Sequence, residues 1–382
     1  MIRRPPKRRR LEAMPRSHTM DAYLDALGRG LLCWQGIAEI ARANVREGLP
    51  SEAIKRLAMC GTVGKHDQNF ERDALRWLRN LWDIKLEPYK LEVELEDGDG
   101  KLQATTIDIL LVHELLGAIW RQGHLQRIAS LFGEDGEHGV AEFWAAAQPE
   151  EWFKVNPFAA YPDLLAHLLG LVFHMDGAQV YNEQEYFFYS VSSIHTAGRG
   201  DAWDTKFPLA AIPHSAMRNR STRDGVHERM SKVIGWSLGC AHTGVNPTEG
   251  FRREPFQEGS HRHQLQGKLI MEGWRACFAG TKGDRKAMYE VHNLDRNWQA
   301  TYICHKDLAS QPYELAVSQF AYTNFSEDAP WRRTMLTHEM RLARFQQQSV
   351  WLIHVPGFHY DLIFDDVMHD NNLGFAAEKT KH

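Results

Sequence analysis

Residues 168–177 read Leu-Leu-Gly-Leu-Val-Phe-His-Met-Asp-Gly, an apolar run that ends on Asp176 with Gly177 behind it. A short apolar run followed by a turn signal is typical of a buried β-strand. An aspartate at the end of such a strand is held rigidly, and carboxylate oxygens are the ligands that cations such as Mg²⁺ prefer. The stretch therefore predicts a buried strand that carries a candidate metal ligand at its end.

Six further segments carry the signals of a turn, strands or helices. They are a polar turn at 182–184, strand-like runs at 186–194, 207–212 and 269–279, and helical spacing at 226–240 and 285–292. Three strands, a helix, a fourth strand and a helix are the order of elements in an RNase H-like α/β domain. In that arrangement Asp176 ends the first strand and Asp284 ends the fourth.

The first 160 residues have mostly helical spacing of apolar residues. Helices are predicted at 21–48, from Glu52 after an N-cap at Ser51, and at 69–84, 106–122 and 137–153, with one strand at 91–95 that turns at 97–100. Pro157 and Pro162 mark a domain boundary. We therefore expect a basic disordered tail over 1–20, a mostly helical N-terminal region over 21–160, a partial RNase H-like catalytic domain over 161–300 and an incomplete insertion region over 301–382.

The composition is that of a soluble globular protein. Apolar residues make up 43% and charged residues 25% of the chain, and the formal net charge is −4, so bulk charge does not indicate a nucleic-acid binder. No apolar run approaches the ~20 residues that span a bilayer, so we expect no membrane partner. The five cysteines never form Cys-x-x-Cys, which argues against a disulfide framework and fits a reducing compartment.

Positive charge is concentrated at the start of the chain, where six of the first ten residues are Arg or Lys. Such a run repels itself and cannot build a core. It fits nuclear import or contact with a phosphate backbone, and on this basis we expect a nuclear location. A plain solubilising tail explains the same residues equally well.

Asp176 and Asp284 form the leading candidate for a metal-binding catalytic site. Phosphodiester cleavage and strand transfer use two metal ions roughly 3.5–4 Å apart, which a few convergent carboxylates can hold. Neighbouring strand ends would bring the two aspartates together, and Gly177 and Gly283 beside them permit close approach of a backbone or substrate. Each signal alone is weak, because Asp-Gly after a strand is usually a turn and Gly-Asp before a helix is usually a helix start.

The order of three segments resembles CACTA-type (En/Spm-like) DDE transposases. The segments are Asp176-Gly177-Ala178, then Lys282-Gly283-Asp284-Arg285-Lys286-Ala287, then Asp366-Val367-Met368-His369 with Leu373-Gly374. The resemblance implies that Asp176 and Asp284 are the first two catalytic, metal-binding acids, with Mg²⁺ or Mn²⁺ as cofactor. It also implies a supporting role for Asp366 and His369, and for Cys304, which stands where the family's Cys-x-x-Cys begins.

Two departures from the family pattern bear on activity. Where the family has Cys-x-x-Cys, this chain reads Cys304-His305-Lys306-Asp307, which offers fewer than the four ligands of a structural zinc site, so no zinc knuckle is predicted. The family's third acid follows the Asp-x-x-His element, and Glu378 is the only glutamate after His369. We do not take Glu378 as a ligand, because it lies in a polar terminal stretch. The chain therefore reads as a truncated or degenerate copy.

Basic clusters indicate where DNA would bind. The first cluster consists of Arg218, Arg220, Arg223, Arg229 and Lys232, and the second of Arg332, Arg333, Arg341 and Arg344. Contacts to the DNA backbone come mainly from such side chains, so DNA is the expected partner, with self-association as a further expectation. A solvated charged helix face explains the same residues equally well.

Two other constellations are weaker candidates. His261 and His263 lack a third metal ligand at suitable spacing. A surface loop is the better interpretation of these two histidines. Ser192, Ser193 and His195 are adjacent but lack the Gly-x-Ser-x-Gly elbow of a hydrolase, so no hydrolase triad is predicted.

The leading hypothesis is a transposase-derived protein that resembles enzymes which cut and join DNA by two-metal phosphoryl transfer. We expect it to be weakly active or inactive, because two acids rarely position both metals, so its status as an enzyme stays open. The alternative is a non-catalytic DNA- or protein-binding module derived from a mobile element. A third interpretation, an unrelated soluble α/β protein, holds if Asp176 and Asp284 lie far apart.

Overall fold

The computed structural model describes most of the chain from Leu86 onward and two short stretches before it. The described residues are 23, 33–48, 52–60, 86–133, 135–181, 184–196, 205–283, 285–292, 307, 309–310, 319–321, 323–324, 326–345 and 355–365. The chain divides into two compact units, Met1–Lys85 and Leu86–His382. The predicted tail over 1–20 and the predicted helix at 69–84 lie outside the described residues.

The first unit contains a pair of helices, α2 (Trp34–Arg46) and α3 (Glu52–Met59). Ile37 and Ala41 of α2 and Leu57 of α3 are almost completely buried, as amphipathic spacing predicts for two packed helices. The Arg42 guanidinium donates to the carbonyl oxygens of Ala58 and Cys60, both at 3.0 Å. It thereby satisfies orphan carbonyls at the end of α3 and links the two helices.

The second unit opens with an antiparallel hairpin. The strands β1 (Tyr89–Glu96) and β2 (Leu102–Ile109) pair from Tyr89 opposite Ile109 to Glu96 opposite Leu102. The turn between them is held by Asp97, whose Oδ1 accepts from the backbone N–H groups of Asp99 and Lys101. The strand predicted at 91–95 is confirmed.

The helix predicted at 106–122 is wrong for its first residues. Residues 106–109 belong to β2, and α5 begins only at Val112 (Val112–Arg121). Ile107 and Ile109 are buried at a spacing of two, which is the strand period, and they pair with Leu91 and Tyr89 across the hairpin. Pairing across the hairpin therefore outweighs the helical spacing that continues towards Trp120.

A run of short helices leads from the hairpin into the main sheet. It comprises α6 (His124–Arg127), the π-helix η1 (Ile128–Phe132), α7 (Gly136–Ala147), α8 (Glu151–Lys154) and the 3₁₀-helices η2 (Pro157–Ala160) and η3 (Pro162–His167). Pro157 and Pro162 each open a 3₁₀-helix, while Phe158 and Leu165 are buried in the same core as the sheet. The boundary predicted at these prolines thus lies inside the second unit, since proline starts a helix as readily as it ends one.

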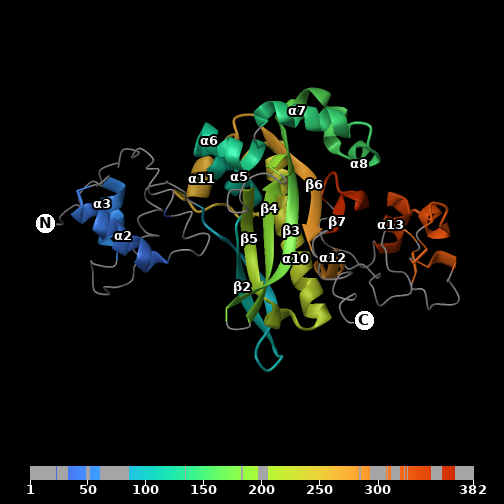
Figure 1. Cartoon of the computed structure of the whole chain (residues 1–382), viewed down its shortest axis with the longest axis horizontal. Coiled ribbons are helices and arrows are strands. Elements are labelled where there is room, and N and C mark those ends of the chain that lie inside the picture. The colour runs from blue at the N-terminus through green and yellow to red at the C-terminus, as the bar shows by residue number, and fades with distance from the viewer. Residues whose placement is uncertain are drawn as a thin grey trace. The chain divides into compact units, whose positions relative to one another are not determined.

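The main sheet has five strands in the order β5-β4-β3-β6-β7. They are β3 (Leu168–Tyr181), β4 (Gln184–Ser193), β5 (Lys206–Pro213), β6 (Arg275–Gly283) and β7 (Ile363–Asp365) (Figure 1). The first three pair antiparallel, whereas β6 is parallel to β3 and β7 is parallel to β6. The chain is therefore a mixed α/β protein, as predicted, and its main sheet is mixed.

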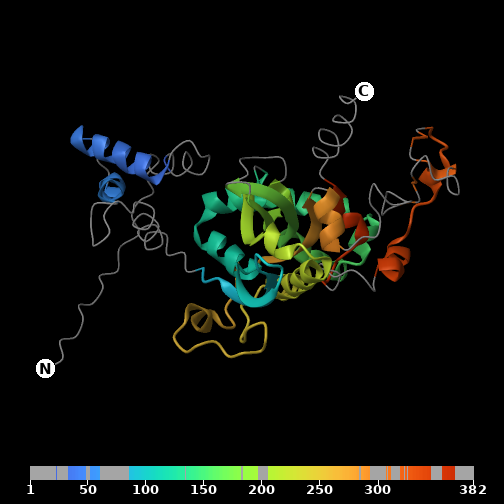
Figure 2. The same cartoon turned by 90° about the horizontal axis from the view of Figure 1, so that it is seen from below.

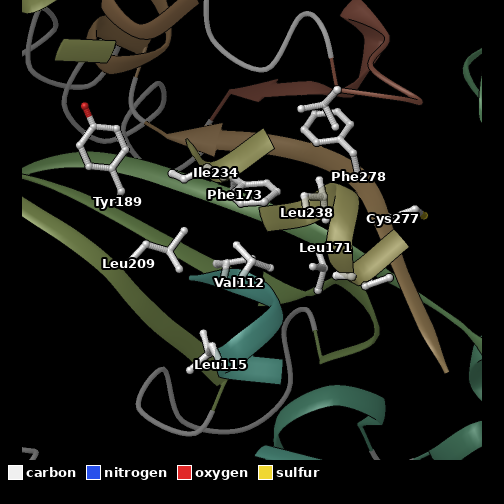
Figure 3. Packing of buried hydrophobic residues seen from close by; sticks show 14 of the residues in the cluster. Val112, Leu115, Leu171, Phe173, Tyr189, Leu209, Ile234, Leu238, Cys277 and Phe278 are labelled. Atoms are coloured by element: carbon white, nitrogen blue, oxygen red, sulfur yellow. The ribbon is translucent and has the colours of Figure 1, made fainter. Parts of the chain in front are cut away.

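The long helix α10 (Arg220–Thr243) connects β5 to the second half of the fold and covers one face of the sheet (Figure 2). Ile234 and Leu238 of α10 lie close to Leu171 and Phe173 of β3 in the buried cluster (Figure 3). Phe173 stacks on Phe278 of β6, with ring centroids 6.2 Å apart. Burial of such side chains typically contributes about 1.5–3 kcal/mol each, so this layer is the main source of stability.

The remaining described helices complete the second unit. They are the 3₁₀-helices η4 (Ile194–Thr196) and η5 (His214–Met217), α11 (His261–Leu265), α12 (Arg285–His292), η7 (Pro330–Arg333), α13 (His338–Phe345) and η8 (Tyr360–Leu362). The strand predicted from residue 269 begins six residues later, at Arg275, because Leu269 and Met271 form only isolated bridges. Among the described helices, none is long and apolar enough to cross a membrane.

Candidate functional site

Asp176 lies on β3, at the level where the parallel strands β6 and β7 end. Met175, the residue before it, pairs with Gly283, the last residue of β6. Gly283 in turn pairs with Asp365, the last residue of β7. Asp176 is partly buried, and its Oδ1 atom is shielded from solvent. One end of the sheet therefore brings three adjacent strands to the same level as this carboxylate.

The Asp176 side chain lies on the face of the sheet opposite α10. Side chains alternate along a strand, and Phe173 and Met175 belong to the core under α10. His174, on the same face as Asp176, pairs in register with Lys282 of β6, and both are partly buried. The face that carries Asp176 thus also carries a lysine and a histidine within two residues of it along the ladder.

At Gly283 the end of β6 lies too close to β3 to leave room for a side chain. A Cβ atom added to Gly283 would overlap the carbonyl oxygen of Met175 and lie 2.7 Å from the terminal methyl of Met288. Any side chain here would push the end of β6 away from β3. The glycine predicted to permit close approach of a backbone therefore does so towards the neighbouring strand.

Four of the predicted site residues lie outside the described residues: Asp284, Asp366, His369 and Cys304. In the sequence Asp284 directly follows Gly283, and Asp366 directly follows Asp365. Within the described part of the chain, no group of three or more His, Cys, Asp or Glu side chains could hold a metal ion. Asp307 is described, and its Oδ1 accepts from the backbone N–H of Ala309 at 2.8 Å, as in a turn.

A buried polar network lies between the sheet, α10 and α12. The Tyr189 hydroxyl is 2.6 Å from His227 Nδ1, and Arg223 Nη1 is 2.9 Å from Glu290 Oε1. Burial lowers the pKa of His227 to about 3, with smaller contributions from Arg223 and His292. The imidazole is then neutral, and the Tyr189 hydroxyl and His227 Nδ1 share one hydrogen bond. Burial also raises the pKa of Tyr189 well above its ordinary value.

This network fixes α12, the helix that begins at Arg285 directly after Asp284. Glu290 links α12 to α10 through Arg223, and His292 Nε2 is 3.0 Å from Thr281 Oγ1 of β6. Both partners of the ion pair are mostly buried, with 18% and 14% of their side chains exposed. The sequence contained a signal for the inward position of Arg223 and His227. These two residues are four apart, on the helix face that also carries the apolar residues Val226 and Met230.

The predicted DNA-binding cluster divides into two kinds of residue. Arg218, Arg220, Arg229 and Lys232 are exposed. Arg229 Nη1 donates to the Glu92 carbonyl at 2.9 Å, and Lys232 pairs with Glu228 at 2.6 Å. Arg223 points inward to Glu290 and does not belong to the exposed set. In the second cluster Arg341 is likewise buried and pairs with Asp361.

Arg223→Gln is expected to lower the free energy of unfolding by roughly 2 kcal/mol, because it leaves the Glu290 carboxylate mostly buried without its partner. Arg220→Gln is the matched control on the same helix, and we expect a change within about 0.5 kcal/mol because Arg220 is exposed. Urea unfolding followed by tryptophan fluorescence measures both. Equal effects of the two substitutions would contradict the structural role of Arg223.

The structure places His195 in η4 and His261 and His263 in α11. His195 Nε2 accepts from the Gly170 backbone N–H at 3.3 Å, and burial lowers the pKa of His195 to about 4. His261 and His263 lie in the short helix α11, which Ser260 caps by accepting from the His263 N–H. Neither arrangement presents an activated nucleophile.

Comparison with protein-family models found no matching family. Comparisons with curated proteins and with solved structures found no match either. The functional interpretation therefore rests on the sequence motifs and on the geometry of the second unit.

Proposed function

We propose that this chain is a transposase-derived protein whose second unit contains an RNase H-like domain. In this proposal Asp176 and Asp284 bind Mg²⁺ or Mn²⁺ in a centre of the DDE type, which acts on DNA phosphodiesters. In the same proposal Asp366 and His369 support that centre. Asp366 directly follows Asp365, the last residue of β7, which pairs with Gly283 of β6. The order of elements supports the proposal: an antiparallel hairpin and third strand, a long helix, and then two strands parallel to the first.

The observation that carries the proposal is the register of β3 and β6. Met175 and Gly283 are paired residues on neighbouring parallel strands, which lie about 4.8 Å apart. Consecutive Cα atoms are about 3.8 Å apart, so the backbone of Asp284 stays within one residue of that pair. In this proposal the two aspartates, each directly after a paired residue in the sequence, share metal ions roughly 3.5–4 Å apart.

The donor set fits a hard divalent cation. Asp176 supplies carboxylate oxygens from a rigid strand, as Mg²⁺ requires, and Asp284 would supply a second carboxylate. A bound metal would neutralise charge on phosphoryl oxygens. The exposed residues Arg218, Arg220, Arg229 and Lys232 would contact the DNA backbone without reading its sequence.

Asp176→Asn is expected to weaken binding of Mn²⁺ to the full chain by about tenfold or more, because an amide replaces a charged ligand at the centre. Titration calorimetry with Mn²⁺ measures the binding directly and does not depend on catalysis. Asp163→Asn, which removes an exposed acid from η3 before β3 begins, is the matched control and should leave binding unchanged. Equal affinities of the wild-type protein and Asp176→Asn would contradict the metal centre.

Nicking of supercoiled DNA in Mg²⁺ or Mn²⁺ separates the proposal from its alternative. Metal-dependent nicking that is lost in Asp176→Asn supports a catalytic centre. Salt-sensitive DNA binding that is indifferent to Asp176→Asn, without nicking, is the behaviour of a non-catalytic module.

A further inference from the structure

A cavity of about 340 Å³ lies at the opposite end of the strands from Asp176. Its lining residues are Pro157, Phe158, Tyr161, Leu164, His242 and Arg275. Arg275 is the first residue of β6 and pairs in register with Leu168 of β3. Eight residues of strand separate Leu168 from Asp176, which corresponds to roughly 26 Å, so the cavity is separate from the proposed metal centre.

The cavity is lined by aromatic rings. The His242 ring lies over Phe158, with ring centroids 4.2 Å apart and planes at 37°. Phe158 is buried, whereas Tyr161 at the rim exposes 59% of its surface. Burial lowers the pKa of His242, and the nearby Arg275 lowers it further. His242 therefore presents a neutral ring at neutral pH.

Phe158, Tyr161 and His242 form the aromatic wall of the cavity, and Arg275 beside them carries a fixed positive charge. Arg275 is partly buried and, within the described part of the chain, has no carboxylate partner. The other five lining residues include no acid. A guanidinium is a planar donor that binds phosphate through paired hydrogen bonds, and it keeps its charge at every physiological pH.

We propose that this cavity binds a nucleoside phosphate, with the base against the aromatic wall and the phosphate on Arg275. The volume is at the lower end of ligand pockets, which suits one nucleotide and no larger ligand. Stacking of bases on aromatic side chains tolerates every base, so the site recognises the nucleotide and not its sequence. The ligand is either a free mononucleotide or one nucleotide of a strand, since both present the same base and phosphate.

Titration of the full chain with adenosine 5′-monophosphate, a short oligodeoxyadenylate and inorganic phosphate tests the proposal. We expect the mononucleotide, the oligonucleotide or both to bind, and to bind more tightly than inorganic phosphate. Binding of the mononucleotide identifies a free ligand as sufficient. Binding of the oligonucleotide alone identifies a strand as the ligand.

Two substitutions assign that binding to the cavity. Arg275→Gln should weaken it about tenfold, because a hydrogen bond to a charged group is lost. Tyr161→Ala should weaken it by a similar factor of about ten, because a stacking face is removed. Lys101→Gln, which removes one positive charge at the tip of the β1–β2 hairpin, is the matched control and should have no effect on the mononucleotide.

Three results would overturn the proposal. They are no binding of either nucleotide, binding that survives both substitutions, and binding of inorganic phosphate as tight as that of the nucleotide that binds. Thermal unfolding of each variant shows whether the fold is intact, which we expect because neither side chain is fully buried. The response of mononucleotide binding to Arg275→Gln and Tyr161→Ala does not depend on Asp176, and Mn²⁺ binding does not depend on the cavity, so failure of the metal centre and failure of this site are distinguishable.

Discussion

Gly283→Ala is expected to lower the free energy of unfolding by about 3 kcal/mol, among the largest effects of any single methyl group in this protein. The added Cβ would overlap the Met175 carbonyl oxygen, which belongs to the backbone of the central strand β3. A backbone atom cannot rotate away as a side chain does, so the end of β6 must separate from β3. The hydrogen bonds at the Met175–Gly283 end of the ladder are lost with it.

Gly239→Ala is the matched control for this substitution. Gly239 lies inside α10, and a Cβ added there has no atom within 4 Å. The same chemical change should therefore raise stability, by about 0.5–1 kcal/mol, because alanine favours the helix. Urea unfolding measures both signs, and a Gly283→Ala protein as stable as the wild type would contradict the close approach of the two strands.

Gly283→Ala also bears on the proposed metal centre. Asp284 follows Gly283 directly, so a displaced end of β6 would move the second carboxylate away from Asp176. We expect the substitution to weaken Mn²⁺ binding together with stability. Asp176→Asn, in contrast, should weaken Mn²⁺ binding with little loss of stability, because Asp176 is only partly buried.

Local sequence patterns predicted the strands and helices around Asp176, but β3 continues to Tyr181, so the prediction that Asp176 ends the strand is wrong. The apolar run at 168–175, the aromatic run at 186–194 and the helical spacing at 226–240 became β3, β4 and α10 with shifted ends. These patterns are local because each reports which side of one element is buried. They failed at 106–109, where strand pairing decided, and at 269–274, where turns bury apolar side chains without a strand.

The site was less predictable because its parts are distant in the sequence. Nothing local indicates that Met175 pairs with Gly283, since register depends on how the whole sheet assembles. The prolines Pro157 and Pro162 predicted only a boundary, and the cavity appears only when α10 and β6 place His242 and Arg275 beside that segment. The sequence groups Arg223 with exposed arginines, because a linear cluster of charge does not show which side chain points inward.

The stability of the second unit is expected to fall steeply as the pH is lowered from about 6.5. Burial is the main reason why the pKa values of His113, His227 and His292 are all lowered to about 3. In the unfolded chain these side chains titrate near 6.5, so below that pH the unfolded state binds protons that the folded state cannot. The stability they contribute is present above pH 6.5 and is lost between about 6.5 and 3.

The size of the effect follows from the number of protons. Each histidine contributes about 1.4 kcal/mol per pH unit within that window, so three together contribute about 4 kcal/mol per unit. A domain with a typical stability of about 5–15 kcal/mol then unfolds before the pH reaches about 3. Urea unfolding at pH 7, 6 and 5 measures the slope.

One substitution assigns part of this slope to a named side chain. His227→Gln should reduce the slope by about 1.4 kcal/mol per pH unit, whatever its effect on stability at pH 7, because one proton is removed from the balance. His138→Gln is the matched control, since 80% of the His138 side chain is exposed and its removal should leave the slope unchanged. Constant stability between pH 7 and 5 would mean that these histidines take up protons in the folded state as readily as in the unfolded chain. The Tyr189–His227 hydrogen bond would then not be the fixed link between β4 and α10 that its 2.6 Å distance indicates.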